Sequence, residues 1–197
     1  MLPPLLQAAK ATGARVFIGT YDLNLIGIRH HRTTANQWDD LLACLYLDET
    51  NAWRGAYWPA TTDPGLPHLV APMRSAGCAV LVPAQYLGAY KEGLHKGRAA
   101  LVQIAPVQVY RDNNKDDQID TSPATIQTLD YSLNIHSVAR TVSDAVNSWS
   151  AGCQVLRHVE HMAELLALLE KQAEHGHGDR VSYTLITAAQ CCGNQKE

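Results

Sequence analysis

Asn134 to Val155 reads NIHSVARTVSDAVNSWSAGCQV, and this stretch carries the most specific pattern in the chain. A strand-like segment ends at His136, a polar loop follows, and Ser150-Ala151-Gly152-Cys153 comes next, with Cys153 seventeen residues after the histidine. A cysteine attacks as its thiolate, which is a minor form of an ordinary thiol at neutral pH, and a histidine within hydrogen-bond reach favours that form. Gly152 permits a tight turn that directs main-chain N–H groups toward an oxyanion. The stretch predicts strand, loop and strand, with Cys153 as a nucleophile and His136 as its base.

This order of residues resembles the L,D-transpeptidase catalytic domain of peptidoglycan enzymes. In that family a histidine, a loop of somewhat over a dozen residues and the motif Ser/Thr-His-Gly-Cys follow one another, as His136, Ser150, Gly152 and Cys153 do here. The resemblance implies that the main-chain carbonyl of Ser137 orients the imidazole. It also implies that the N–H groups of Gly152 and Cys153 polarise the substrate carbonyl.

The chain departs from the family motif at two positions. The histidine before the glycine is Ala151 here, and the arginine two residues after the cysteine is Val155. The second change removes an anchor for a substrate carboxylate, which we expect Arg157 to replace. Further substrate contacts are predicted at Ser150 and at two residues of a glycine-rich loop, Tyr90 and His95.

Short apolar runs separated by turn residues predict a β-rich α+β domain. The resemblance refines this to an L,D-transpeptidase-like β-sandwich or barrel, with a short N-terminal helix and one longer helix after the cysteine. We expect one catalytic domain over residues 1–188 and a flexible tail over 189–197. The predicted helices are 4–12 and Val159–Glu174, and the predicted strands are Arg15–Gly19, Leu23–Arg29, Leu41–Leu47 (a run that also fits a helix), Trp53–Trp58, Cys78–Val82, Ala99–Ile104, Pro106–Tyr110, Tyr131–His136 and Arg180–Ile186.

Composition limits the classes of function. The net charge of −3 gives no electrostatic footprint for nucleic acid. No stretch approaches the length of about 20 apolar residues that spans a bilayer, so no membrane span is expected. The first residues, MLPPLLQAAKATGAR, lack the basic region of a signal peptide, which predicts cytoplasmic synthesis and a separate delivery apparatus. The odd number of cysteines predicts free thiols; they are Cys44, Cys78, Cys153, Cys191 and Cys192.

An acidic loop follows the predicted strand at Pro106–Tyr110. Oxygen-bearing side chains recur there with the spacing of a calcium loop, at Asp112, Asn114, Asp116 and Asp120. Asp117 takes the place of the usual glycine, and no glutamate closes the loop. A solvated hairpin loop and a structural Ca²⁺ site are therefore both open interpretations, and the cysteine chemistry requires no cofactor.

The first functional hypothesis is an enzyme that cleaves or exchanges the L,D-peptide bonds of peptidoglycan stem peptides. It would act in the periplasm or cell wall as a phage lysis protein or a secreted antibacterial effector, and an effector implies an immunity protein as a partner. One alternative is a cysteine amidase that acts on another substrate. The other is a non-enzymatic phage structural or binding domain that keeps the fold.

Overall fold

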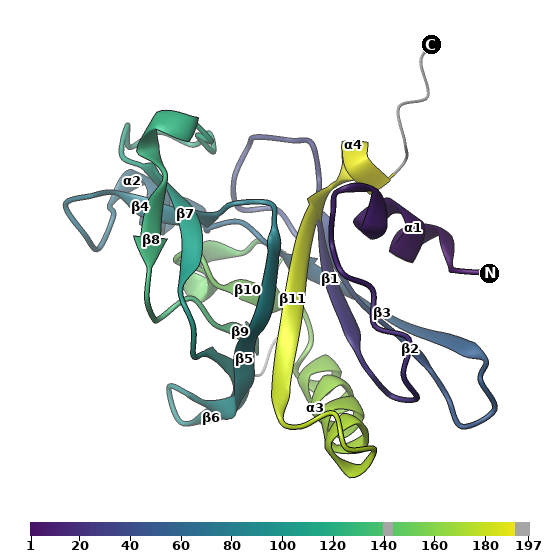
Figure 1. The fold of residues 1–197 in the computed structure, drawn as a ribbon. Coiled ribbons are helices and arrows are strands. Elements are labelled where there is room, and N and C mark those ends of the chain that lie inside the picture. Colours follow the sequence, from purple (N-terminus) through teal and green to yellow (C-terminus); the bar gives the residue numbers. More distant parts are fainter. Residues whose placement is uncertain (140–143, 192–197) are drawn as a thin grey trace.

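The computed structural model describes residues 1–139 and 144–191, and strands dominate it (Figure 1). Eight of the described strands close into a barrel in the order β1-β11-β5-β6-β9-β10-β3-β2. Their bounds are β1 Asn24–Arg29, β2 Asp40–Leu47, β3 Trp53–Thr61, β5 Gln85–His95, β6 Arg98–Gln103, β9 Ile135–Ser137, β10 Gln154–Leu156 and β11 Arg180–Thr187.

A smaller sheet lies beside the barrel. It has the order β4-β7-β8, with β4 at Cys78–Leu81, β7 at Val107–Asp112 and β8 at Gln127–Leu129. Neighbouring strands within it are antiparallel. The helices are α1 Pro4–Ala11, α2 Leu66–Val70, α3 Val159–Glu174 and α4 Ala188–Cys191, with 3₁₀ turns at Pro123–Thr125 and Asn147–Trp149.

Successive residues of the barrel strands point to opposite faces of the sheet and contribute to two separate apolar layers. In β1, Leu25 belongs to the main core, whereas Ile26 joins the cluster that buries Leu6 of α1. In β2, Leu42 and Ala43 divide between the same two clusters. This period of two is what a strand produces when both of its faces are covered. The α1 helix therefore packs outside the barrel, on β1 and β2.

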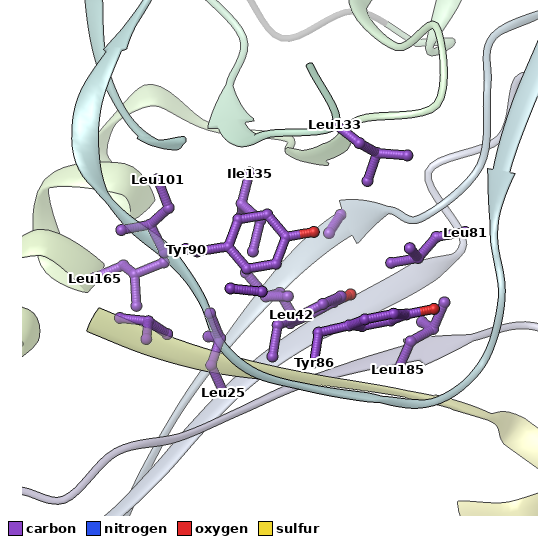
Figure 2. Packing of buried hydrophobic residues seen from close by; sticks show 14 of the residues in the cluster. Leu25, Leu42, Leu81, Tyr86, Tyr90, Leu101, Leu133, Ile135, Leu165 and Leu185 are labelled. Atoms are coloured by element: carbon purple, nitrogen blue, oxygen red, sulfur yellow. The ribbon is translucent and has the colours of Figure 1, made fainter. Parts of the chain in front are cut away.

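The main core fills the barrel interior (Figure 2). The rings of Tyr90 and Tyr183 meet edge to face within it, with centroids 6.0 Å apart. The apolar stripe of α3 adds Leu165 to this core. Trp58 is buried as well, and its indole N–H donates to Glu164 of α3. The helix after the cysteine is thus anchored to the barrel by both packing and a hydrogen bond.

The predicted strand-rich α+β class is confirmed, and the ambiguous run at 41–47 is a strand. The strand predicted at Arg15–Gly19 is wrong, because this segment has no strand partner. The N–H groups of Arg15 and Phe17 donate instead to the side chains of Gln85 and Asn24. The strand predicted at Tyr131–His136 is shorter than expected and begins only at Ile135.

The prediction of a glycine-rich loop around Gly88, Gly93 and Gly97 is also wrong. Residues 85–95 form the long strand β5, which pairs with β6 through a tight turn at Lys96-Gly97. Both turn residues have positive φ, as this kind of hairpin requires. Gly88 has positive φ inside the strand, close to an irregularity in the β5–β11 register. The glycines here mark a bulge and a hairpin rather than a loop.

Residues at the end of the predicted domain continue into α4, which contacts α1. The helical turn at 188–191 therefore includes the first residues of the predicted tail, and 192–197 lie outside the described residues. Part of the polar loop predicted between His136 and Ser150, residues 140–143, also lies outside them. Among the described residues, no helix is long and apolar enough to cross a membrane.

Candidate active site

The two residues predicted to carry the chemistry lie on neighbouring strands. β9 and β10 are parallel, and His136 pairs with Val155 in their register. Paired residues project to the same face of a sheet, and Cys153 lies two positions before Val155 on that face. Cys153 and Val155 share a small apolar cluster separate from the barrel core. The site is therefore on the outside of the barrel, in a cavity of about 480 Å³ bounded on its other side by residues of the small sheet.

The His136 imidazole is held in one orientation. Its Nδ1 lies 3.0 Å from the main-chain carbonyl oxygen of Ser137, to which it donates, as the sequence predicted. The ring is 6% exposed, and Nε2 has no hydrogen-bond partner among the described residues. Burial lowers the pKa of His136 to about 4, against the opposing effect of the Ser137 contact. At neutral pH this side chain is an uncharged base whose available lone pair is on Nε2.

The Cys153 thiol is 8% exposed and lines the same cavity. Burial raises its pKa, while the N–H of Asn134, the charge of Lys96 and its own N–H oppose that rise. The N–H of Asn134 lies 3.4 Å from Sγ, and the S–H points to the carbonyl of Ser132 at 3.7 Å. No hydrogen bond joins Sγ to His136 within the described geometry. The expectation that His136 lowers the thiol pKa is therefore not met in this resting arrangement.

Gly152 forms the turn before Cys153. Its φ is +116°, and a Cβ here would overlap the carbonyl oxygen of Ala79 in β4. Only glycine fits both constraints. However, the N–H of Gly152 donates to Ser150 Oγ at 3.1 Å, so it is not available to an oxyanion as predicted.

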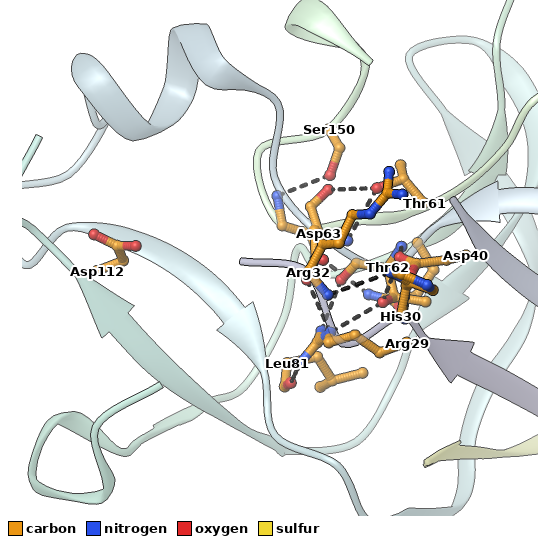
Figure 3. A network of polar contacts seen from close by, with 12 residues as sticks. Arg29, His30, Arg32, Asp40, Thr61, Thr62, Asp63, Leu81, Asp112 and Ser150 are labelled. Carbon is orange, nitrogen blue, oxygen red and sulfur yellow. Dashed lines mark hydrogen bonds and ion pairs between the residues drawn. The ribbon is translucent and has the colours of Figure 1, made fainter. Parts of the chain in front are cut away.

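Ser150 has a structural role instead of the predicted substrate contact. It is 0% exposed, and its hydroxyl donates to the carbonyl of Cys153 at 2.8 Å. Its own carbonyl accepts the N–H of Gly65 at 2.9 Å. Figure 3 shows Ser150 beside the turn that carries Thr61 and Asp63. Ser150 thus joins the cysteine loop to that turn.

A buried ion pair fixes this turn from behind. Arg29 contacts Asp63 at 2.8 Å and donates to the carbonyl of Leu81. Asp40 accepts hydrogen bonds from the N–H and hydroxyl of Thr62. Burial and the nearby Asp40 raise the pKa of Asp63, despite the opposing charge of Arg29. The network links β1, β2 and β4 at the base of the cysteine loop.

His95 comes from β5 and lies directly against the base. Its ring stacks on His136 with centroids 4.4 Å apart. The N–H of Gln103 donates to Asn134 Oδ1 at 3.0 Å, which sets the orientation of that amide. The amide nitrogen of Asn134 then donates to His95 Nδ1, also at 3.0 Å. Because Nδ1 accepts, neutral His95 carries its proton on Nε2, where it can serve a group in the cavity.

Two other predicted substrate contacts lie elsewhere. Tyr90 is 0% exposed in the barrel core, so its predicted role in substrate binding is wrong. Arg157 follows β10 but does not line the cavity, and its main-chain N–H donates to Pro59 of β3. The structure therefore brings His95 to the site, but it does not bring Tyr90 or Arg157 there.

Residues of the acidic loop form hydrogen bonds with one another, as in a hairpin loop. The amide nitrogen of Asn114 donates to both Asp116 and Asp120, so a donor points to where a cation would lie. The carboxylate of Asp112 accepts the N–H of Asp120. Within the described ranges, no group of three or more His, Cys, Asp or Glu side chains is arranged to hold a metal ion. These hydrogen bonds within the loop favour its interpretation as a hairpin.

Two cationic side chains at the cavity, those of Arg74 and Arg111, were not predicted, and a third, that of Lys96, follows the predicted His95. Arg74 precedes β4, Arg111 lies in β7, and Lys96 lies in the β5–β6 turn. Cys78 of β4 lines the cavity too, and burial raises its pKa to about 12. No local pattern in the sequence marks Arg74 or Arg111, because the packing of the small sheet on β9 and β10 brings them to the cavity.

Fold and site together define a strand-rich α+β barrel with a buried histidine and a buried cysteine on its outer face. Comparisons with protein-family models, with curated proteins and with solved structures find no match to this chain.

Proposed function

We propose that this chain is a cysteine enzyme of L,D-transpeptidase-like fold that cleaves or exchanges L,D-peptide bonds in peptidoglycan stem peptides. The observation that carries the proposal is the His136 ring, which is bound through Nδ1 to Ser137, has a buried Nε2 without a partner among the described residues, and lines the same cavity as Cys153. An imidazole that is uncharged at neutral pH and held in one orientation has the protonation state that a general base requires. The order of His136, Ser150, Gly152 and Cys153 and the strand-rich fold also support the proposal.

In the proposed reaction both groups start uncharged. The S–H turns from Ser132 to His136 Nε2, a contact that tightens when substrate is bound. As Sγ attacks the carbonyl carbon of the L-centre, the proton passes to Nε2, and the Ser137 carbonyl stabilises the imidazolium. The imidazolium then gives this proton to the nitrogen of the departing D-amino acid, and a thioester remains on Cys153.

The oxyanion of the tetrahedral intermediate needs hydrogen-bond donors. Since Gly152 N–H is bound to Ser150, the donors that we assign to the oxyanion are the N–H of Cys153 and Nε2–H of His95. His95 of β5 would thereby replace the histidine that the family motif has at the position of Ala151. Water or an amine then attacks the thioester, which yields hydrolysis or transpeptidation.

The test is incubation of purified sacculi with the wild-type protein and with Cys153→Ala, followed by mass spectrometry of the digested muropeptides. We expect loss of a terminal D-amino acid with the wild type, or its exchange when D-methionine is added. Cys153→Ala and His136→Gln should reduce the rate by on the order of a hundredfold or more. Cys78→Ala is the matched control, since it removes a second thiol from the same cavity, and it should retain the activity.

Alkylation rates of the thiols by iodoacetamide, measured beside this experiment, separate the other interpretations. Rapid alkylation of Cys153, dependent on His136 and without any change in muropeptides, would indicate a cysteine amidase with another substrate. Equal alkylation rates for Cys153 and Cys78, together with unchanged muropeptides, would indicate a non-enzymatic domain.

A further inference from the structure

The cavity beside Cys153 has an unbalanced positive charge. Arg74, Lys96 and Arg111 line it, and its lining includes neither aspartate nor glutamate. None of the three forms an ion pair within the part of the chain that the structure describes. Positive charges in a concave site with low-dielectric walls create a potential that attracts anions. The cavity is therefore complementary to a negatively charged ligand.

Arg111 is the most constrained of these cations. Its Nε donates to Gln127 of β8 at 3.1 Å, and Nη1 donates to the carbonyl of Gly77 at 3.4 Å. Its Nη2 has no acceptor among the described residues. Burial lowers the pKa of Arg111, and the charge of Arg74 lowers it further, so a bound anion would relieve both effects. A fixed, partly desolvated guanidinium is the group best suited to carboxylate recognition.

Arg111 is also close to the nucleophile. It pairs with Ala79 in the β4–β7 register, and Ala79 packs directly on Gly152. Paired residues of adjacent strands lie about 5 Å apart and project to the same face. Arg111 is thus one strand spacing from the residue that contacts the cysteine loop. Arg111 and Cys153 also line the same cavity, so a carboxylate bound at Arg111 shares that cavity with Sγ.

We propose that Arg111, assisted by Arg74, forms a subsite for the terminal carboxylate of the amino acid that leaves when Cys153 attacks. The identity of the ligand rests on the proposed function, because in an L,D-peptide bond at a chain end the carboxylate carbon is two bonds from the scissile nitrogen. Arg157, the anchor expected from the sequence, is outside the cavity. Lys96 has a different role, since its charge lowers the pKa of the Cys153 thiol.

The test measures binding without catalysis. The Cys153→Ala protein is titrated calorimetrically with N-acetyl-L-alanyl-γ-D-glutamyl-L-lysyl-D-alanine and with the same peptide carrying a C-terminal amide. The acid form should bind on the order of tenfold more tightly than the amide. Adding Arg111→Gln or Arg74→Gln should bring the acid form close to the amide. Adding Arg180→Gln, which removes an exposed charge on β11, should leave the discrimination intact.

Equal affinity for the acid and amide forms, or no binding of the acid form, would overturn the subsite. So would discrimination that survives both arginine changes. Arg74 is exposed, so its substitution keeps the test valid if Arg111→Gln does not fold. Arg111→Lys keeps the charge but loses the planar fork, and it should retain only part of the discrimination.

The two proposals fail in different ways. Discrimination without any Cys153-dependent cleavage of sacculi would support the subsite and refute the proposed enzyme. Cleavage without discrimination would support the enzyme and refute the subsite.

Discussion

Folding withdraws the His136 imidazole from water and leaves it with a single hydrogen bond, to Ser137. The group therefore titrates differently in the folded and unfolded chains. Its pKa falls from an ordinary 6.5 to about 4 in the folded protein. As pH decreases from 6.5 toward 4, the unfolded chain binds a proton before the native one does. This group's contribution to stability is thus fully present above pH 6.5 and is lost as pH falls through that range.

We predict that His136→Gln flattens the acid limb of the stability profile. The pKa difference corresponds to about 3 kcal/mol of stability, which the wild type loses at this group by pH 4 and the variant does not. Urea unfolding of both proteins between pH 4 and 7.5 measures their free energies of unfolding. Subtracting one pH profile from the other cancels the contributions of other groups such as Asp63. NMR titration of the His136 ring should give a pKa near 4. Parallel stability profiles, or a ring pKa near 6.5, would contradict the prediction.

At the residue scale, the sequence placed His136 and Cys153 at one site and predicted the Ser137 contact, since these residues lie within one short stretch. The catalytic roles of His136 and Cys153 stay predictions. It did not reveal that Ser150 occupies the Gly152 N–H. That bond depends on how the loop is held by the Thr61–Gly65 turn, which is far away in sequence. The protonation site of His95 was equally hidden, because it depends on Asn134 and Gln103 on two other strands.

At the scale of elements, β4 packs against the loop that carries Cys153. Gly152 makes this contact possible, since its backbone approaches Ala79 and has positive φ. Gly97, in the β5–β6 turn, also has positive φ, but a Cβ added there would meet no atom within 4 Å. Substitution of Gly97 therefore tests backbone strain alone, whereas substitution of Gly152 tests backbone strain together with steric overlap.

We predict that Gly152→Ala lowers the free energy of unfolding by about 3 kcal/mol, of which strain at positive φ supplies about 1 and displacement of β4 the remainder. Gly97→Ala should cost only the strain, about 1 kcal/mol. Denaturant unfolding of both variants measures the two values. Equal losses would show that β4 yields without cost and that its contact with the cysteine loop is loose.

Element prediction succeeded where an apolar run had a partner strand and failed where composition alone suggested one. Arg15–Gly19 has strand-like residues, yet side chains of Gln85 and Asn24 satisfy its N–H groups. β5 was missed for the opposite reason, because glycines at a bulge and a hairpin read locally as loop signals.

At the scale of the whole molecule, barrel closure decides which residues meet. β1 lies between β2 and β11, so the two ends of the described chain close the barrel together. The small sheet brings Arg74 and Arg111 to Cys153 from 79 and 42 positions earlier in the chain. Such non-local pairings leave no periodic trace in the sequence, and for this reason the cationic wall of the cavity was not predicted.

The barrel also separates the apolar layer under α1 from the cavity that contains Cys153. Leu6 of α1 is 0% exposed in the cluster outside β1 and β2, whereas residues at β9 and β10 and of the small sheet line the cavity. Figure 1 shows α1 and the small sheet on opposite sides of the barrel. We predict that Leu6→Ala lowers the free energy of unfolding by about 3 kcal/mol, the usual cost of truncating a buried leucine. Ile18→Ala, at a side chain that is 68% exposed, is the control and should change it by less than about 0.5 kcal/mol.

In both variants the alkylation rate of Cys153 by iodoacetamide at pH 7.5 should stay within about twofold of the wild type, because distant sites without shared partners contribute independently. Peptide-resolved mass spectrometry gives this rate separately from those of Cys44 and Cys78. A faster reaction at Cys153 in Leu6→Ala alone would mean that the reagent reaches the thiol through partial opening of the barrel. The cavity would then depend on α1 packing, and the two layers would form one cooperative unit.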